Sequence, residues 1–117
     1  MKRFFYVVLL LITIACEDLI EVPDISDATV VLLAPSHQST LSITSPTFSW
    51  NEVVDADSYR LQIATPSFEA ATQIVLDTTI TATNFTKMLS LGNYQWRVRA
   101  ENSAYQTNYT ANAFVIE

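Results

Sequence analysis

In residues 93–100 every second side chain is apolar, and the side chains between them are polar or charged. A repeat of two residues is that of an extended strand, in which successive side chains point to opposite faces. A strand with one apolar and one polar face belongs to an antiparallel sheet with one face in water. The segment therefore predicts such a sheet. Its apolar positions are Tyr94, Trp96, Val98 and Ala100.

Shorter stretches of the same alternation occur at residues 47–50 and 58–63, and no long stretch has the 3.6-residue repeat of an amphipathic helix. The chain of 117 residues is long enough for one domain. Seven short strands separated by turn-like segments favour an immunoglobulin-like β-sandwich. We expect the strands near residues 29–34, 46–50, 58–64, 73–78, 83–87, 93–101 and 111–117.

The composition argues against several classes of protein. Half of the residues are hydrophobic, which is too many for a disordered chain. Twelve acidic and six basic residues give a net charge of −6, the wrong sign for binding nucleic acid. One His and one Cys leave no disulfide within the chain and little material for a metal cage or a nucleophile pair. We therefore expect no enzymatic activity, no cofactor and no metal.

Residues 1–15 have the parts of a secretory signal peptide. Lys2 and Arg3 give a positive start, and the uncharged, mostly apolar run 4–14 is shorter than the roughly 20 residues of a membrane-spanning helix. A small residue, Ala15, then precedes Cys16. The segment predicts export of the chain.

The sequence Thr-Ile-Ala-Cys at residues 13–16 resembles the lipobox of bacterial lipoproteins. In that family the Cys is acylated and becomes the first residue after cleavage. The resemblance implies a lipid anchor at Cys16, and acyl chains of this kind hold a small domain firmly at a membrane. A plain signal peptide followed by an incidental Cys is the alternative.

Residues 17–27 include five acids and no base. Because like charges repel, residues 16–27 are expected to form an extended tether between the lipid and a domain at 28–117. Acids directly after the lipidated Cys also resemble the surface-export signal of Bacteroidetes-type lipoproteins. That resemblance implies an outer-membrane protein displayed at the cell surface, with the periplasmic face as the alternative.

Three segments, 46–53, 56–63 and 89–102, resemble a bacterial fibronectin type III domain, and the resemblance extends over residues 30–117. It implies a seven-stranded antiparallel sandwich without the Cys pair of antibody domains. Several residues receive roles from the resemblance. They are Trp50 in the core, Tyr59 at the start of the third strand, Leu89 and Tyr94 in a tyrosine corner, and Gly92 in a turn with positive φ.

A candidate ligand site combines two loops. Asp55 and Asp57 precede the third strand, and Tyr105 and Tyr109 lie between the last two strands, which should place all four at one end of the sandwich. Tyrosines in loops make adaptable contacts and can stack on sugar rings. The alternatives are a solvated turn for the acids and an ordinary hairpin for the tyrosines. The residue pattern of a calcium loop is missing.

Two further sets of polar residues are candidates for a functional role. Arg97 and Arg99 share one strand face, with Arg60 on the adjacent strand. Arginines placed in this way could bind an anionic ligand. A solvated face whose arginines pair with acids such as Glu101 is the favoured interpretation. His37 lies in a polar stretch and is expected to be an exposed loop residue without a catalytic role.

The sequence thus predicts a non-catalytic outer-membrane lipoprotein with one binding, adhesion or spacer domain. A glycan-binding accessory lipoprotein of a polysaccharide-uptake system is the alternative. The expected partners are the membrane, through Cys16, and an envelope protein or a glycan.

Overall fold

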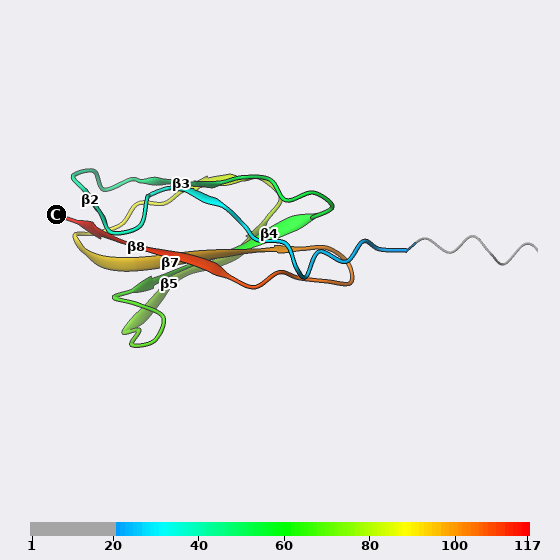
Figure 1. Ribbon diagram of the computed structural model, residues 1–117. Coiled ribbons are helices and arrows are strands. Elements are labelled where there is room, and N and C mark those ends of the chain that lie inside the picture. Colours follow the sequence, from blue (N-terminus) through cyan, green and yellow to red (C-terminus); the bar gives the residue numbers. More distant parts are fainter. Residues whose placement is uncertain (1–20) are drawn as a thin grey trace, which may run out of the picture.

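Two β-sheets pack face to face in the structure, which is a computed structural model and describes residues 21–117 (Figure 1). The predicted all-β, immunoglobulin-like sandwich is confirmed. The strands are β1 (Leu32–Ala34), β2 (Ser39–Leu41), β3 (Thr47–Trp50), β4 (Ser58–Thr65), β5 (Gln73–Ile80), β6 (Asn84–Thr86), β7 (Gly92–Glu101) and β8 (Thr110–Ile116). The small sheet has the order β1-β3-β6, and the large sheet has the order β2-β8-β7-β4-β5.

The sandwich has eight strands where seven were expected, because β2 was missed. This short strand pairs in parallel with the end of β8, while all the other paired strands are antiparallel. The chain passes from the small sheet to the large one through a turn in which Gln38 has φ 64° and donates its backbone N–H to the carbonyl oxygen of Ala113. A three-residue strand in a polar stretch carries no alternation that could have revealed it.

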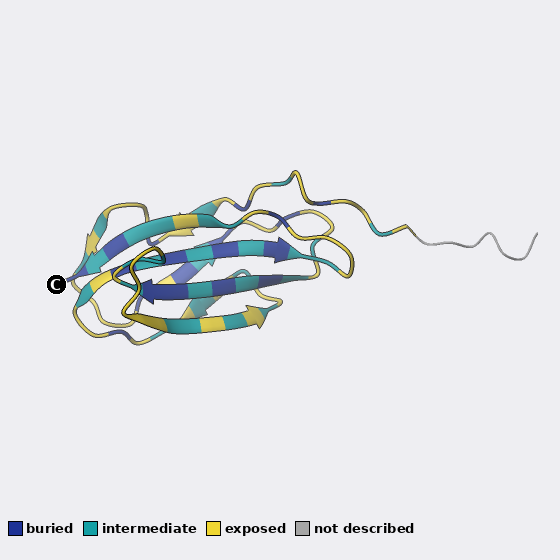
Figure 2. Ribbon diagram, turned by 90° about the horizontal axis from the view of Figure 1, so that it is seen from below, coloured by how far each residue is buried: buried dark blue, intermediate teal, exposed yellow. Residues whose placement is uncertain are grey.

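The core lies between the sheets and consists largely of aromatic rings. Phe48 of the small sheet meets Trp96 and Phe114 of the large one edge to face, at centroid distances of 5.1 and 5.7 Å. Trp50 meets Tyr59 in the same way at 5.8 Å. All five rings are buried, which confirms the expected core position of Trp50. Tyr59 lies at the start of β4, the strand that was expected as the third. Figure 2 shows the alternation as bands of buried and half-buried residues along the central strands.

The tyrosine corner is present. The hydroxyl of Tyr94 donates to the carbonyl oxygen of Ser90 at 2.8 Å, and Leu89 is buried beneath the turn. Gly92 has φ 152°, a conformation that side chains with a Cβ rarely adopt. The corner therefore fixes where the long strand β7 begins.

The packed part of the chain begins before residue 28. Ile25 is 5% exposed and belongs to the core cluster, and its carbonyl oxygen accepts the N–H of Ala28 at 2.9 Å. The side-chain amide of Asn102 donates to the carbonyl oxygen of Pro23 at 2.9 Å. Part of the segment expected to be a tether thus lies against the domain. The expected signal peptide 1–15 and Cys16 lie outside the described residues.

Residues 21–117 contain no helix that is long and apolar enough to cross a membrane.

Candidate functional site

The loops at 51–57 and 102–109 lie side by side, as the sequence predicted. Asp57 donates its backbone N–H to the carbonyl oxygen of Glu101 at 2.8 Å, and the Asn102 amide reaches the carbonyl oxygen of Asp55 at 3.3 Å. Asp55 has φ 70°, a left-handed conformation that Asp tolerates better than most residues. Since Asn102 also binds Pro23, both loops lie at the end where the N-terminal segment enters the domain (Figure 1).

Tyr105 belongs to this end of the sandwich. The residue is 38% exposed and borders a shallow, open depression that Val22, Pro23 and Ala104 also line. Its backbone N–H donates to the side-chain oxygen of Asn102 at 2.8 Å, which closes the tip of the hairpin. The N-terminal segment thus occupies much of the space beside the loop.

Asp55 and Asp57 remain two exposed carboxylates in one loop. Within residues 21–117, no group of three or more His, Cys, Asp or Glu side chains is arranged so that it could hold a metal ion. Because hard cations need several oxygen ligands, the two acids by themselves do not make a metal site.

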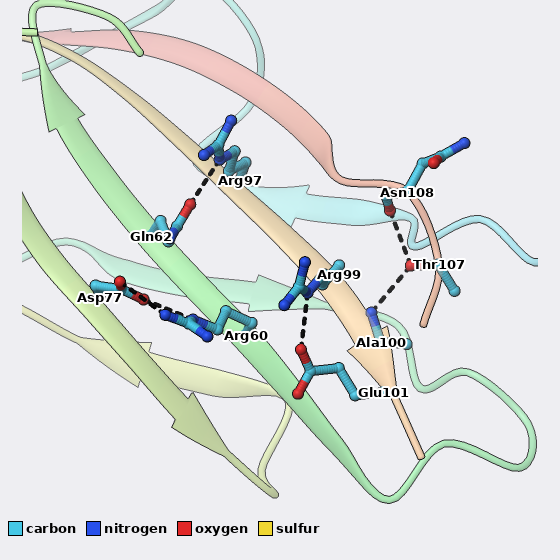
Figure 3. A network of polar contacts seen from close by, with 9 residues as sticks. All are labelled: Arg60, Gln62, Asp77, Arg97, Arg99, Ala100, Glu101, Thr107 and Asn108. Carbon is cyan, nitrogen blue, oxygen red and sulfur yellow. Dashed lines mark hydrogen bonds and ion pairs between the residues drawn. The ribbon is translucent and has the colours of Figure 1, made fainter. Parts of the chain in front are cut away.

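Thr107, which was not predicted from the sequence, holds the hairpin in place. It is 3% exposed, and its hydroxyl accepts the N–H of Ala100 at 3.0 Å and donates to the carbonyl oxygen of Asn108 at 2.8 Å (Figure 3). A buried Thr with both hydrogen-bonding functions satisfied is a structural residue. It directs the chain from the loop back to the sheet.

Tyr109 does not join the other candidates at the loop end. Its ring lies on the outer face of the large sheet, 4.3 Å from the guanidinium carbon of Arg97 and 4.9 Å from that of Arg99. Val98 pairs with Thr110, so the residue before Thr110 falls beside Arg99 on the outward side. The expected grouping of Tyr109 with Asp55, Asp57 and Tyr105 is therefore wrong, because Tyr109 follows the alternation of β8.

The outer face of the large sheet carries the three arginines, and two of them pair with acids (Figure 3). Arg60 donates to both carboxylate oxygens of Asp77 at 2.7 and 2.9 Å. Arg99 donates to Glu101 at 2.7 Å. The expected pairing of these arginines with acids is confirmed. The hydrogen bonds from Arg60 hold the pKa of the Asp77 carboxyl below its usual range.

Arg97 is held differently, by a neutral side chain and two aromatic rings. Its Nε donates to the amide oxygen of Gln62 at 2.7 Å, and its guanidinium carbon lies 4.0 Å from the centroid of Phe68. Phe68 comes from the loop between β4 and β5, and its backbone N–H donates to the side chain of Gln95 at 2.8 Å. Phe68 was not among the site residues predicted from the sequence. The indication that the sequence offered for Phe68 was a single aromatic residue in a loop of small and polar residues.

His37 is exposed, as expected, and lies in the turn before β2. Its Nδ1 accepts the backbone N–H of Ala113 at 3.1 Å. The imidazole thus helps to fasten the turn to β8, which is a structural task.

Comparison with known proteins places the fold. No protein-family model and no curated protein matches the chain. A solved fibronectin type III domain derived from the human KIAA0970 protein is similar to it, with a TM-score of 0.53, 16% identity, and coverage of 74% of this chain and 72% of the other. An Fn3-like protein from Clostridium thermocellum superposes with a TM-score of 0.50 at 18% identity, over 76% of this chain and 86% of the other.

The domain has a fibronectin type III-like fold. At these identities the likeness of the fibronectin type III-like domain to solved structures concerns the fold alone, since one fold carries many functions. What the domain does has to be argued from its own surface.

Proposed function

We propose that this chain is a non-catalytic, lipid-anchored outer-membrane protein whose fibronectin type III-like domain is a binding or spacer module. The observation that carries the proposal is the order of parts. An apolar run and Cys16 precede an acidic segment, and that segment enters the sandwich at the end opposite to Glu117 (Figure 1). A domain attached in this way stands on the membrane with its C-terminal end pointing outward.

In this orientation the two ends of the sandwich have different roles. The loops with Asp55, Asp57 and Tyr105 face the anchor, where the N-terminal segment already contacts Asn102. A partner in solution meets the other end of the domain or its sides first. The surface that contacts a partner is therefore expected away from these loops.

Three large hydrophobic side chains are exposed in the loops at the outward end. Ile43 is 57% exposed, Met88 74% and Leu91 68%. The hydrogen bond from the Leu89 N–H to the carbonyl oxygen of Thr44, at 2.7 Å, brings their two loops together. Exposed apolar side chains in neighbouring loops favour contact with another macromolecule. They support a binding role over that of a pure spacer.

Lipidation is tested with the full chain expressed in a bacterial host that processes lipoproteins. We expect an alkyne-labelled fatty acid to be incorporated into the wild type and not into Cys16→Ser. Intact mass of membrane-extracted protein should show that residues 1–15 are absent and acyl chains present. A chain that keeps residues 1–15 and carries no lipid would refute the anchor.

Orientation is tested by protease shaving of intact cells that express the chain with a C-terminal tag. Loss of the tag without lysis supports the surface display suggested by the acids after Cys16. Protection of the tag until the outer membrane is broken would place the domain in the periplasm.

A glycan-binding accessory protein is the second candidate function. It is favoured by Arg97, which stands with two aromatic rings on an exposed sheet face. Rings beside a hydrogen-bond donor are a combination suited to sugars, because an aromatic ring packs on the C–H face of a pyranose while the donor binds its polar substituents.

A further inference from the structure

The three arginines of the outer sheet face differ in how their charge is balanced. Arg60 and Arg99 each donate to a carboxylate, Asp77 and Glu101 respectively. The guanidinium of Arg97 makes one hydrogen bond within residues 21–117, from Nε to the neutral amide oxygen of Gln62. The N–H groups of its two terminal nitrogens therefore have no acceptor in the described part of the chain. No carboxylate there forms an ion pair with Arg97, and Asp77, whose pKa is lowered mainly by Arg60 and in part by Arg97, is held by Arg60.

Two rings hold this guanidinium in place. Phe68 is fastened by its backbone to Gln95, and Tyr109 lies beside Arg99, so the rings approach Arg97 from opposite directions along β7. Rings at about 4 Å from a guanidinium attract it and cover its faces. The Nε bond to Gln62 fixes the rotation of the group. The N–H groups at its outer edge thus have a fixed orientation, and a ligand that accepts hydrogen bonds from them does not have to order the side chain first.

A fixed guanidinium edge with two free terminal nitrogens binds a carboxylate best, through two parallel hydrogen bonds. The surroundings limit the charge of the ligand. The chain has a net charge of −6, and Asp77 and Glu101 stand on the same face. A polyanion would be repelled, whereas one carboxylate on an otherwise neutral carrier would be accepted.

We propose that Arg97, Phe68, Tyr109 and Gln62 form a binding site for the carboxylate of a uronic acid sugar. The carboxylate accepts the terminal N–H groups of Arg97, and Gln62 holds the guanidinium in place through its amide oxygen. The half-buried rings of Phe68 and Tyr109 offer apolar surface to the C–H groups of the sugar. This site gives the glycan-binding candidate a substrate class, and it does not depend on lipidation at Cys16.

The test is a titration of the isotope-labelled full chain in detergent micelles, followed by NMR at constant ionic strength. Sodium glucuronate is the probe, and glucose and sodium acetate are the controls. We expect saturable shifts at Gln62, Phe68, Arg97 and Tyr109 with a Kd of about 1 mM, the strength expected for a ligand of this size. Glucose should leave these signals unchanged, and acetate should bind at least roughly fivefold more weakly because it lacks the ring.

Variants assign the effect to the guanidinium. Arg97→Lys keeps the charge and loses the planar edge, and it should weaken glucuronate binding at least about fivefold. Arg60→Lys is the matched control, because Arg60 lies on the same face and its guanidinium is already occupied by Asp77. It should bind glucuronate as the wild type does. The amide spectrum of each variant shows whether it is folded.

Several results would overturn the proposal. The absence of saturable shifts in the wild type would do so without any variant. Equal binding by Arg97→Lys and the wild type would remove Arg97 from the site. Equal affinity for acetate and glucuronate, or tighter binding of a short neutral peptide through its C-terminal carboxylate, would rule out the sugar. None of these results bears on the lipid anchor, which the fatty-acid labelling tests separately.

Discussion

The indole N–H of Trp96 donates a hydrogen bond of 3.2 Å to the carbonyl oxygen of Pro35, which ties the centre of β7 to the turn after β1. Trp50 packs beside Trp96 with a centroid distance of 6.3 Å and is as deeply buried. Its indole nitrogen, however, has no acceptor among the described residues. The two core tryptophans therefore provide similar packing and differ in one hydrogen bond.

Replacing each tryptophan by Phe should separate these contributions. Both changes remove similar volume, but only Trp96→Phe loses a hydrogen bond, worth about 1 kcal/mol. Trp50→Phe removes an unpaired buried donor, which offsets part of its packing loss. We expect Trp96→Phe to lower the free energy of unfolding more, by at least about 1 kcal/mol, in urea titrations followed by the remaining tryptophan. Equal losses would mean that the Trp50 nitrogen has an acceptor after all.

Two tyrosine hydroxyls should differ in the same kind of experiment. Tyr59 accepts the buried N–H of Val53 at 2.9 Å, and Tyr59→Phe leaves this donor without a partner, at a cost of about 1–3 kcal/mol. Tyr94→Phe frees the carbonyl oxygen of the exposed Ser90, which water can bind, and should cost about 0.5–1.5 kcal/mol. Equilibrium denaturation measures both. A larger loss of unfolding free energy for Tyr94→Phe would mean that the tyrosine corner stabilises the fold by more than this one hydrogen bond.

The Arg60–Asp77 pair should contribute to the acid limb of the stability profile. Hydrogen bonding from Arg60 lowers the pKa of Asp77 in the folded state. The pair therefore stabilises the fold above the unfolded pKa, about 3.9, and its contribution is lost as the pH falls through the folded value. We expect the difference in melting temperature between wild type and Asp77→Asn to be small at pH 6, because the pair is exposed, and to shrink towards pH 2.

Arg60→Gln is the control for this prediction. It removes the same interaction from the other side, so its difference from the wild type should shrink over the same pH range. A difference that stays constant down to pH 2 would show that Asp77 acts through packing rather than through its charge.

Gly92 should resist replacement for a backbone reason. A Cβ added there would lie 3.8 Å from a ring carbon of Tyr94, an ordinary contact, so space is not the obstacle. The positive φ of 152° is the obstacle, and we expect Gly92→Ala to cost about 1–3 kcal/mol. Gln38→Gly is the opposite case, since it relieves a φ of 64° and should leave stability unchanged or slightly raise it. Thermal unfolding of both variants measures whether stability falls for Gly92→Ala and is unchanged or raised for Gln38→Gly.

Alternation in the sequence was sufficient to predict the central strands, because in β4 and β7 the local pattern and the buried face coincide. It failed for β2, whose parallel pairing with β8 arises from the packing of distant segments. The position of Tyr109 could have been predicted, because Tyr109 lies an even number of residues before the outward-facing residues of β8. The position of Phe68 was not, because a hydrogen bond to Gln95, 27 residues further on, brings its loop onto the sheet.

The parallel pairing of β2 with β8 also determines how the domain would respond to force. Ser39, Thr40 and Leu41 lie beside Phe114, Val115 and Ile116, and both strands run towards the same end. A pull on the N-terminal side and an opposite pull at Glu117 would slide these strands lengthwise, so their hydrogen bonds would be loaded together rather than one after another. A domain pulled between its N-terminal side and Glu117 would therefore resist extension where β2 pairs with β8.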